Sequence, residues 1–118
     1  MKTVLERRLR RKLRIKRRLA SNINTPQVIV FKSNKYTYAQ VYDPKSQKVL
    51  FGLSSKTVLK NSQILLPKTQ AAFETGKRLA EWLSQKGLSK VVFNRNGFKY
   101  HGRVKAVCEG LRASGIAV

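Results

Sequence analysis

The first twenty residues of the chain include ten lysines and arginines but one acid, Glu6, so this segment carries a net charge of +9. The other 98 residues hold sixteen basic and four acidic residues, a net charge of +12 that is spread about four times more thinly. The sequence therefore predicts two parts, a basic arm at residues 1–22 and a globular domain at residues 23–118.

The arm has the spacing of a helix. Leu5, Leu9 and Leu13 recur at four-residue intervals, which places them on one side of a 3.6-residue helical repeat. Arg8 and Lys12 interrupt that apolar side, so the helix would be basic all round. Like charges four residues apart each oppose a free helix by about 0.2–0.5 kcal/mol. We therefore expect the arm to stay frayed until phosphate groups surround it.

Three functions of the arm are compatible with this pattern: a segment that folds on RNA or DNA, a helix on a membrane surface, or a solvated run of charge. A membrane-surface helix needs a continuous apolar face, which the basic residues interrupt here. Seven of the ten basic residues are arginines, whose planar fork binds phosphate in bidentate fashion and stacks on bases. This composition favours a nucleic-acid-binding arm.

The whole chain has the size of a single folded domain. Its 118 residues are 42% hydrophobic, which suffices for a core, and its formal net charge is +21. Such a charge repels itself and attracts polyanions, so we expect nucleic acid as the partner. The one cysteine, Cys108, cannot form an intramolecular disulfide, and its position on the apolar side of a predicted helix places it in the core.

The body alternates between strand and helix signals. Apolar or alternating runs predict strands at Val28 to Lys32, Tyr36 to Tyr42, Lys48 to Leu53 and Val91 to Phe93. Helical spacing predicts one helix of about four turns between Pro67 and Gly87 and a second at about Gly102 to Ala113. Between Ser54 and Pro67 the pattern is loose, and Ile64 to Leu66 form a predicted docking patch.

These elements predict an α+β fold, an α/β two-layer domain preceded by the basic N-terminal helical arm. The first three strands form an antiparallel meander because short turns join them, whereas the fourth follows a helix and should pair in parallel. The result is a mixed sheet of about four strands with two helices on one face. Trp82 is expected to pack between helix and sheet, and the opposite face, on the side of Tyr36, Tyr38 and Tyr42, is left for something else to cover.

The sequence also bears on location. No apolar run approaches the roughly 20 residues that cross a bilayer, and no hydrophobic segment follows the basic start. A mitochondrial transit peptide would share the arginine-rich composition of the arm, but the arm leads straight into sequence typical of a fold. We expect a cytoplasmic protein without a membrane partner.

Residue types for catalysis are scattered along the chain. The acids lack the paired spacing of a general acid and base, and His101 and Cys108, the one histidine and the one cysteine, are too few for a metal cluster. No phosphate-loop or dinucleotide glycine pattern occurs. We therefore expect a protein that is not an enzyme and needs no cofactor, metal or small-molecule substrate.

The densest group of potential binding residues lies between the last strand and the last helix, at Arg95 to Arg103. Two glycines permit tight turns and close backbone approach, while Phe98 and Tyr100 interleave the basic residues. The helix that opens near Gly102 presents free N–H groups to a phosphate. The segment is either a nucleic-acid contact or a plain strand-to-helix connection whose aromatic rings cap the core.

Two long segments resemble a known family. Residues 93–104, FNRNGFKYHGRV, resemble the signature F-D-R-x-G-F-x-Y-H-G-R-V of bacterial-type large-subunit ribosomal protein L-eighteen. Residues 30–43, VFKSNKYTYAQVYD, are similar to its segment V-F-R-S-N-x-x-I-Y-A-Q-V-x-D. The order of arm, strands and helices also agrees, so the resemblance covers nearly the whole chain.

The resemblance implies a structural protein that attaches 5S rRNA to the large subunit at the central protuberance, beside 23S rRNA, ribosomal protein L-five and other proteins of that region. It further implies that the basic arm and one face of the domain contact RNA in the cytoplasmic ribosome. Matched by position, the RNA-binding candidates are Arg7, Arg8, Arg10, Arg11, Lys12, Arg14, Lys16, Arg17, Arg18, Lys32, Ser33, Asn34, Tyr38, Gln40, Arg95, Tyr100, His101, Gly102 and Arg103.

Two departures from the family pattern change the expected contacts. Asn94 stands where the family usually has Asp. The segment from Asn24 to Gln27 lacks the arginines that often flank the proline at this place in the family, here Pro26. Contacts made by those arginines are therefore not expected here. The alternative function is a basic DNA-architectural protein of nucleoid type, although the sequence has neither a dimerisation feature nor a helix suited to the major groove.

Overall fold

A computed structural model describes residues 3–19, 25–62 and 66–118, with the backbone alone at 16–19 and 60–62. Helix α1 (Val4–Leu19) precedes three strands, β1 (Gln27–Lys32), β2 (Thr37–Asp43) and β3 (Lys48–Ser54). The remaining elements are helices α2 (Ser55–Ser62) and α3 (Lys68–Gln85), strand β4 (Val92–Asn94) and helix α4 (Gly102–Ala113).

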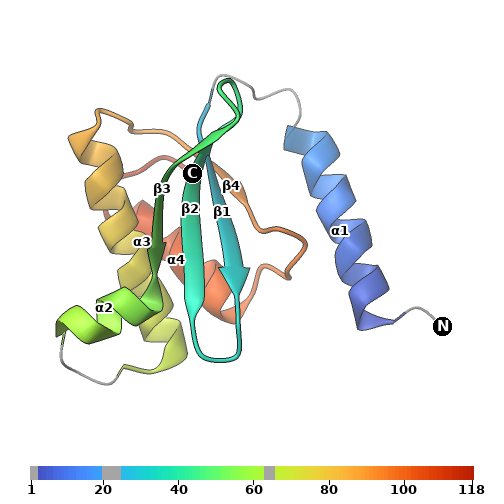
Figure 1. The fold of residues 1–118 in the computed structure, drawn as a ribbon, viewed down its shortest axis with the longest axis horizontal. Helices are drawn as coiled ribbons and strands as arrows, with labels where there is room; N and C mark the ends of the chain where they lie inside the picture. Colours follow the sequence, from blue (N-terminus) through green and yellow to red (C-terminus); the bar gives the residue numbers. More distant parts are fainter. Residues whose placement is uncertain (1–2, 20–24, 63–65) are drawn as a thin grey trace.

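The strands form one mixed sheet in the order β3-β2-β1-β4, in which β4 runs parallel to β1 and the other neighbours are antiparallel. Short turns join the first three strands, whereas a helical crossover through α3 brings the chain to the far edge of the sheet. Helices α3 and α4 cover one face and leave the other open (Figure 1). The predicted α+β class, mixed sheet and two helices on one face are confirmed.

Alternation along the strands decides which side chains are buried. On β2, Ala39 and Val41 are fully buried beneath the helices, whereas Tyr38 and Gln40 lie on the open face. Tyr36 lies in the turn before β2. The prediction that the tyrosine side of this strand faces away from the helices is therefore confirmed for the residues within the strand.

The two helices pack closely against each other and against the sheet. Trp82 of α3 stacks on Phe51 of β3 with ring centroids 4.8 Å apart, and Cys108 of α4 is buried, as the sequence predicted for both. Gly76 of α3 and Gly110 of α4 mark the helix crossing, because a Cβ on either would collide with the backbone of the other helix. Helices α3 and α4 and the sheet thereby enclose one hydrophobic core.

Helix α2 lies in the segment whose loose pattern did not predict a helix. The buried hydroxyl of Ser55 at its start accepts a hydrogen bond from the backbone N–H of Thr37 at 2.9 Å, which fixes α2 to the sheet. Eight residues are too short for a helical period to stand out, although Ser54 is a residue type preferred at helix starts. The docking patch predicted at residues 64–66 lies outside the described residues except for Leu66, which is half-buried.

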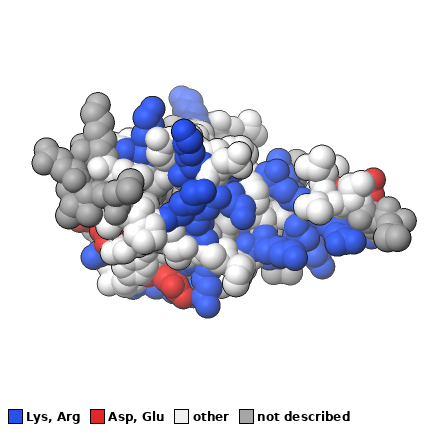
Figure 2. Space-filling view, turned by 90° about the horizontal axis from the view of Figure 1, so that it is seen from below, with Lys and Arg blue, Asp and Glu red and all other residues white. Residues whose placement is uncertain are grey.

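Helix α1 lies beside the sheet, and the loop between β4 and α4 extends toward it (Figure 1). The predicted helical arm is thus confirmed over Val4–Leu19. Its fraying in the absence of phosphate stays a prediction. Seen from below, lysines and arginines are spread along the arm and over the neighbouring part of the body (Figure 2).

Replacing Gly76 by Ala should destabilise the domain, because the new methyl group would meet the carbonyl oxygen of Val107. Alanine is otherwise the better helix residue by about 1 kcal/mol, so a loss can come only from overpacking, which costs about 1–3 kcal/mol. We expect a net loss of about 1–2 kcal/mol in urea unfolding.

The control for this measurement is Gly52→Ala on β3, where the nearest atom to the new Cβ is Gln40 Cγ at 3.6 Å, an ordinary contact. This variant should keep the wild-type urea midpoint or exceed it slightly. A midpoint for Gly76→Ala equal to that of Gly52→Ala would contradict the close crossing of α3 and α4.

Candidate nucleic-acid interface

Helix α1 is attached to the body at the turn that follows β4. The guanidinium group of Arg8 stacks on the ring of Phe98, with Cζ 3.9 Å from the ring centroid. Arg11 donates a hydrogen bond from Nε to the carbonyl oxygen of Gly97 at 2.9 Å. One turn further along the helix, Ile15 is only 5% exposed. These contacts give the arm a defined orientation relative to the domain.

The turn at residues 94–97 has the backbone shape that this attachment requires. Gly97 has a φ of +80°, in the left-handed region that glycine adopts without strain. A Cβ at this position would lie 2.6 Å from the carbonyl oxygen of Arg8, so only glycine lets the helix come this close. Asn94 holds the turn by accepting a hydrogen bond at Oδ1 from the N–H of Asn96 at 2.9 Å. It supplies the acceptor that an aspartate would supply, without the negative charge.

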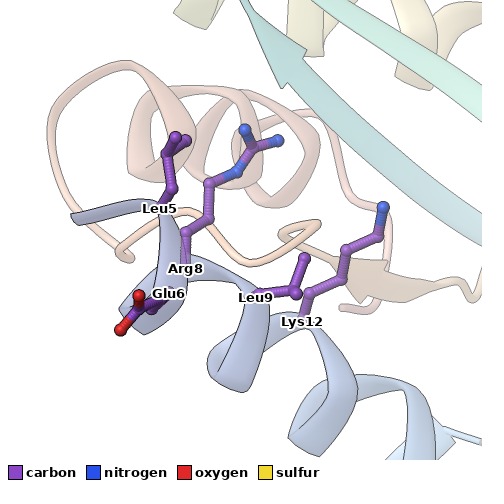
Figure 3. A pocket seen from close by; sticks show the side chains of 5 residues that line it. All are labelled: Leu5, Glu6, Arg8, Leu9 and Lys12. Carbon is purple, nitrogen blue, oxygen red and sulfur yellow. The ribbon is translucent and has the colours of Figure 1, made fainter. Parts of the chain in front are cut away.

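One flank of α1 is an exposed leucine side. Leu5, Leu9 and Leu13 are 74%, 61% and 51% exposed. Arg8 and Lys12 lie beside the first two of these leucines around a shallow hollow (Figure 3). Arg8 is turned onto the body, while Lys12 stays exposed beside the leucines. That the helix is basic all round stays a prediction, because Lys16 has a side chain outside the described residues.

The other flank of α1 consists of arginines. Arg7, Arg10 and Arg14 recur at three- and four-residue intervals, which places them on one side of the helix, and all three are exposed. They point away from the attached side and remain available to a partner. The candidates at residues 16–18 have helical backbone, and their side chains lie outside the described residues.

A cleft of about 650 Å³ lies between the first half of α1, the loop before α4 and the start of α3. Each of these elements contributes cations to the lining. The basic residues are Arg8, Arg11, Lys32, Lys68, Lys99 and Arg103, with Thr69, Phe98, His101 and Gly102 among the others. No acidic side chain of the described residues lines the cleft, and the view from below shows basic residues across this region (Figure 2).

Two helices begin at this cleft without a side-chain cap. Helix α3 starts at Lys68 after Pro67, and α4 starts at Gly102 after His101; neither has an acidic residue in its first turn. A helix N-terminus favours negative charge by about 0.3–1 kcal/mol, yet Lys68 and Arg103 occupy these positions. The free N–H groups and the cations are donors and charges of the kind that phosphate oxygens accept.

The turn between β1 and β2 is bonded to the start of α4. Arg103 donates a hydrogen bond from Nη1 to the carbonyl oxygen of Tyr36 at 3.3 Å, and the N–H of Ser33 donates to the same oxygen at 2.8 Å. Asn34 is exposed within this turn. The structure thus places Arg103 in the cleft and Ser33 and Asn34 outside it.

The open face of the sheet has a hollow of about 500 Å³ next to the turn that holds α1. The lining residues are Ile29, Phe31, Ser33, Tyr38, Gln40 and Asn96. Phe31 is 47% exposed, and its ring centroid lies 6.0 Å from those of both Tyr38 and Phe98. The candidates Ser33, Tyr38 and Gln40 therefore gather on the sheet rather than in the cleft.

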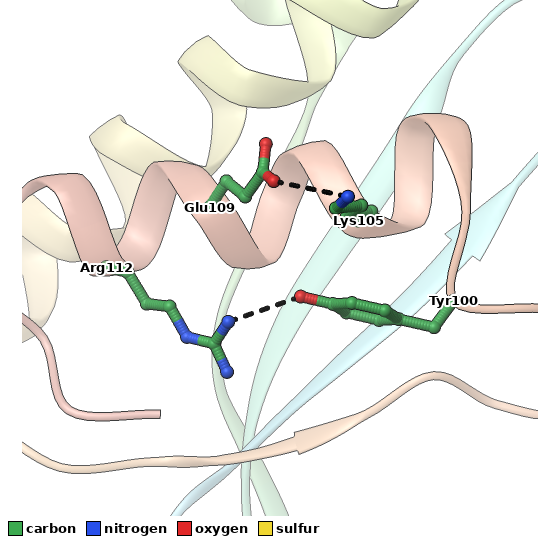
Figure 4. Close-up of polar contacts among 4 residues, drawn as sticks. All are labelled: Tyr100, Lys105, Glu109 and Arg112. Atoms are coloured by element: carbon green, nitrogen blue, oxygen red, sulfur yellow. Dashed lines mark hydrogen bonds and ion pairs between the residues drawn. The ribbon is translucent and has the colours of Figure 1, made fainter.

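Tyr100 is held against α4 and lines neither the cleft nor the hollow. Its ring packs edge-on against Phe93 at 6.3 Å, and its hydroxyl accepts a hydrogen bond from Nη1 of Arg112 at 3.4 Å (Figure 4). A side-chain hydrogen bond with Cys108, together with partial burial, raises the pKa of the Tyr100 hydroxyl above its usual value. Tyr100 is thus a neutral group that links the loop to α4.

Two other basic residues near the signature lie apart from the cleft. Lys105 pairs with Glu109 along α4, with Nζ 3.8 Å from Oε1 (Figure 4). The candidate Arg95 is half-buried and lines neither the cleft nor the hollow. The sequence cluster at residues 95–103 is therefore divided in space, with the cleft taking part of it.

Three polar cleft residues, Lys68, Thr69 and Lys99, are absent from the candidates that the sequence supplied. Lys68 carried a usable signal, because a cation directly after Pro67 lies at the positive end of a predicted helix, where it is disfavoured unless an anion is bound. Phe31 on the open face is also absent from the candidates that the sequence supplied. Its signal was the alternation along the first strand, in which Val28 and Val30 are the buried partners.

Other kinds of site find no support in the described part of the chain. There, no three side chains of histidine, cysteine, aspartate or glutamate gather as a metal ion would require. No helix in the same part combines the length and the apolar character needed to span a membrane.

The chain matches a known family over almost its full length. The family profile described as ribosomal L18 of archaea, bacteria, mitochondria and chloroplast matches residues 2–118. The large ribosomal subunit protein uL18 of Nitratidesulfovibrio vulgaris strain DP4 is 35% identical over 111 residues, which cover 94% of this chain and 93% of that protein. The uL18 of Bacteroides fragilis is 37% identical over 116 residues, 98% of each chain. That of Petrotoga mobilis is 39% identical over 112 residues, 92% of this chain and 90% of its own.

Replacing Gly97 by Ala should release α1 from the body, because the new Cβ would collide with the backbone of Arg8. We expect trypsin to cut after Arg8 and Arg11 about tenfold faster than in the wild type, since release exposes both bonds. The control is Gly87→Ala, which has the same left-handed strain at a φ of +73° but whose Cβ would meet nothing within 4 Å. Equal cleavage rates for the two variants would contradict the attachment.

Proposed function

The chain belongs to the ribosomal L18 family of large-subunit proteins, and from that premise we propose that it binds 5S rRNA and helps to attach it to 23S rRNA in the central protuberance. The family is of a structural rather than a catalytic kind. Ribosomal protein L-five and other proteins of the central protuberance are the proposed neighbours, and the cytoplasmic ribosome is the proposed location.

The observation that carries this proposal is the cleft between the arm and the body. Six basic side chains line it, no described acid does, and two uncapped helices begin there. The positive charges of the six side chains repel one another in the free protein, and phosphates of an RNA strand relieve that repulsion. Phosphate contacts position a protein on RNA, while shape and 2′-hydroxyl contacts supply specificity.

The arm supports the attachment of one RNA to another. We propose that residues 1–22 act as the RNA-binding arm of the globular domain at residues 23–118. Arg8 and Arg11 face the cleft, whereas Arg7 and Arg14 are exposed on a different flank of the helix. Two RNA segments can therefore contact α1 at once, as a protein that joins 5S rRNA to 23S rRNA requires.

A filter-binding titration tests the specific role. At moderate salt, the full chain should bind 5S rRNA at least about tenfold more tightly than tRNA or duplex DNA of similar length. Duplex DNA is included because the alternative function is that of a DNA-architectural protein. Equal affinities for the three nucleic acids would refute 5S rRNA binding as the specific function.

The salt dependence of 5S rRNA binding tests the cleft itself. Each phosphate contact contributes about 0.7–0.9 to the slope of log K against log salt, so Lys68→Gln with Lys99→Gln should reduce the slope by about 1.4–1.8. The control is Lys45→Gln with Lys48→Gln, two exposed lysines at the turn between β2 and β3. It removes the same charge and should leave the slope nearly unchanged. An equal reduction in both double variants would mean that the cleft is not the contact.

A further inference from the structure

A row of aromatic rings runs from the arm onto the open face of the sheet. Arg8 lies over Phe98, Phe98 meets Phe31 edge-on at an interplanar angle of 71°, and Phe31 meets Tyr38 at 44°. Nearly half of Phe31 stays exposed although its neighbours contact it from two sides. The row therefore ends in an aromatic surface that faces solvent inside the hollow on the sheet.

Polar side chains lie beside these rings in the hollow. In the part of the chain that the structure describes, neither the hydroxyl of Tyr38 nor the side-chain amide of Gln40 makes a hydrogen bond. Both line the hollow together with Asn96. A hydroxyl and two amides supply donors and acceptors of the kind that pair with the edge of a nucleobase.

The hollow lies next to the cationic cleft. Phe98 lines the cleft and contacts Phe31, which lines the hollow. Lys32 Nζ lies 5.4 Å from the same Phe98 ring, so cations stand at the border of the aromatic surface. No described acid lines the hollow, and its volume of about 500 Å³ is that of a small-ligand site.

Building on the RNA-binding function proposed above, we propose that this hollow holds one unpaired RNA base, stacked on Phe31 and Tyr38, while the adjoining cleft holds phosphates of the same strand. Only an unpaired base has a free π-face to offer, because a base within a helix is covered by its neighbours. An apolar protein segment fits less well, since it would leave the Tyr38 hydroxyl and the Gln40 amide unpaired next to unneutralised cations.

Two RNA probes of equal charge separate base stacking from phosphate attraction. One is a single-stranded RNA hexamer with 2-aminopurine near its centre, and the other is the same hexamer with an abasic site there. The full chain should bind the 2-aminopurine hexamer between about 5- and 150-fold more tightly than the abasic hexamer. The fluorescence of the 2-aminopurine should be quenched on binding. Equal affinities for the two hexamers would overturn the proposal without any variant.

Matched variants then locate the base. Phe31→Leu and Tyr38→Leu keep an apolar side chain but remove the aromatic face, so each should reduce both the preference for the base and the quenching. Tyr42→Leu makes the same change on β2 outside the hollow and should keep both. Quenching that survives in the Phe31→Leu/Tyr38→Leu double variant would overturn the proposal.

A photo-crosslinker identifies the occupant in assembled particles. With p-benzoylphenylalanine in place of Phe31, large subunits should yield a crosslink to RNA, and a crosslink to protein would overturn the proposal. Failure of the base site is distinct from failure of the function. Preference for 5S rRNA over tRNA with equal binding of the two hexamers would leave the proposed function standing and remove the base site alone.

Discussion

The contact of Arg8 with Phe98, reinforced by the hydrogen bond from Arg11 to Gly97, is the interaction on which the arrangement of cations depends. It attaches a highly charged helix to the body without an acidic partner, since an aromatic face and a backbone carbonyl oxygen bind the two guanidinium groups. An attachment through salt bridges would cancel the charge of the arm. The contacts of Arg8 and Arg11 with the body keep the positive charge of both side chains and fix its position.

The distribution of charge follows from this attachment. Arg8 and Arg11 form one wall of the cleft, and the loop before α4 and the start of α3 form the others. The exposed arginines on the other flank of α1 form a second basic surface. No described acidic residue lines the cleft, and Glu109 pairs with Lys105 along α4, away from it. Part of the net charge of +21 is therefore gathered at defined places on the surface, where the repulsion among like charges favours a polyanionic partner.

Local patterns predicted most of the fold and part of the candidate interface. The strands and the helix over Gly102–Ala113 were predictable because periods of two and 3.6 residues are properties of short segments. Helix α2 was too short for such a period. The docked side of α1 could not be predicted either, since the choice between the Arg8 row and the leucine row depends on a turn ninety residues away. The cleft likewise joins Lys68 to Lys99 only through the tertiary fold.

Directed hydroxyl-radical cleavage of bound 5S rRNA tests the central claim, that RNA occupies the cleft beneath the arm. The native Cys108 is buried, so an iron chelate can be attached selectively to a cysteine introduced at Thr69 in the cleft or, for comparison, at the exposed Lys45. Iron at position 69 should cut a narrow stretch of the 5S rRNA backbone strongly, and iron at position 45 should cut that stretch weakly. Equal cutting from the two positions, or none from position 69 in a fully formed complex, would contradict the claim.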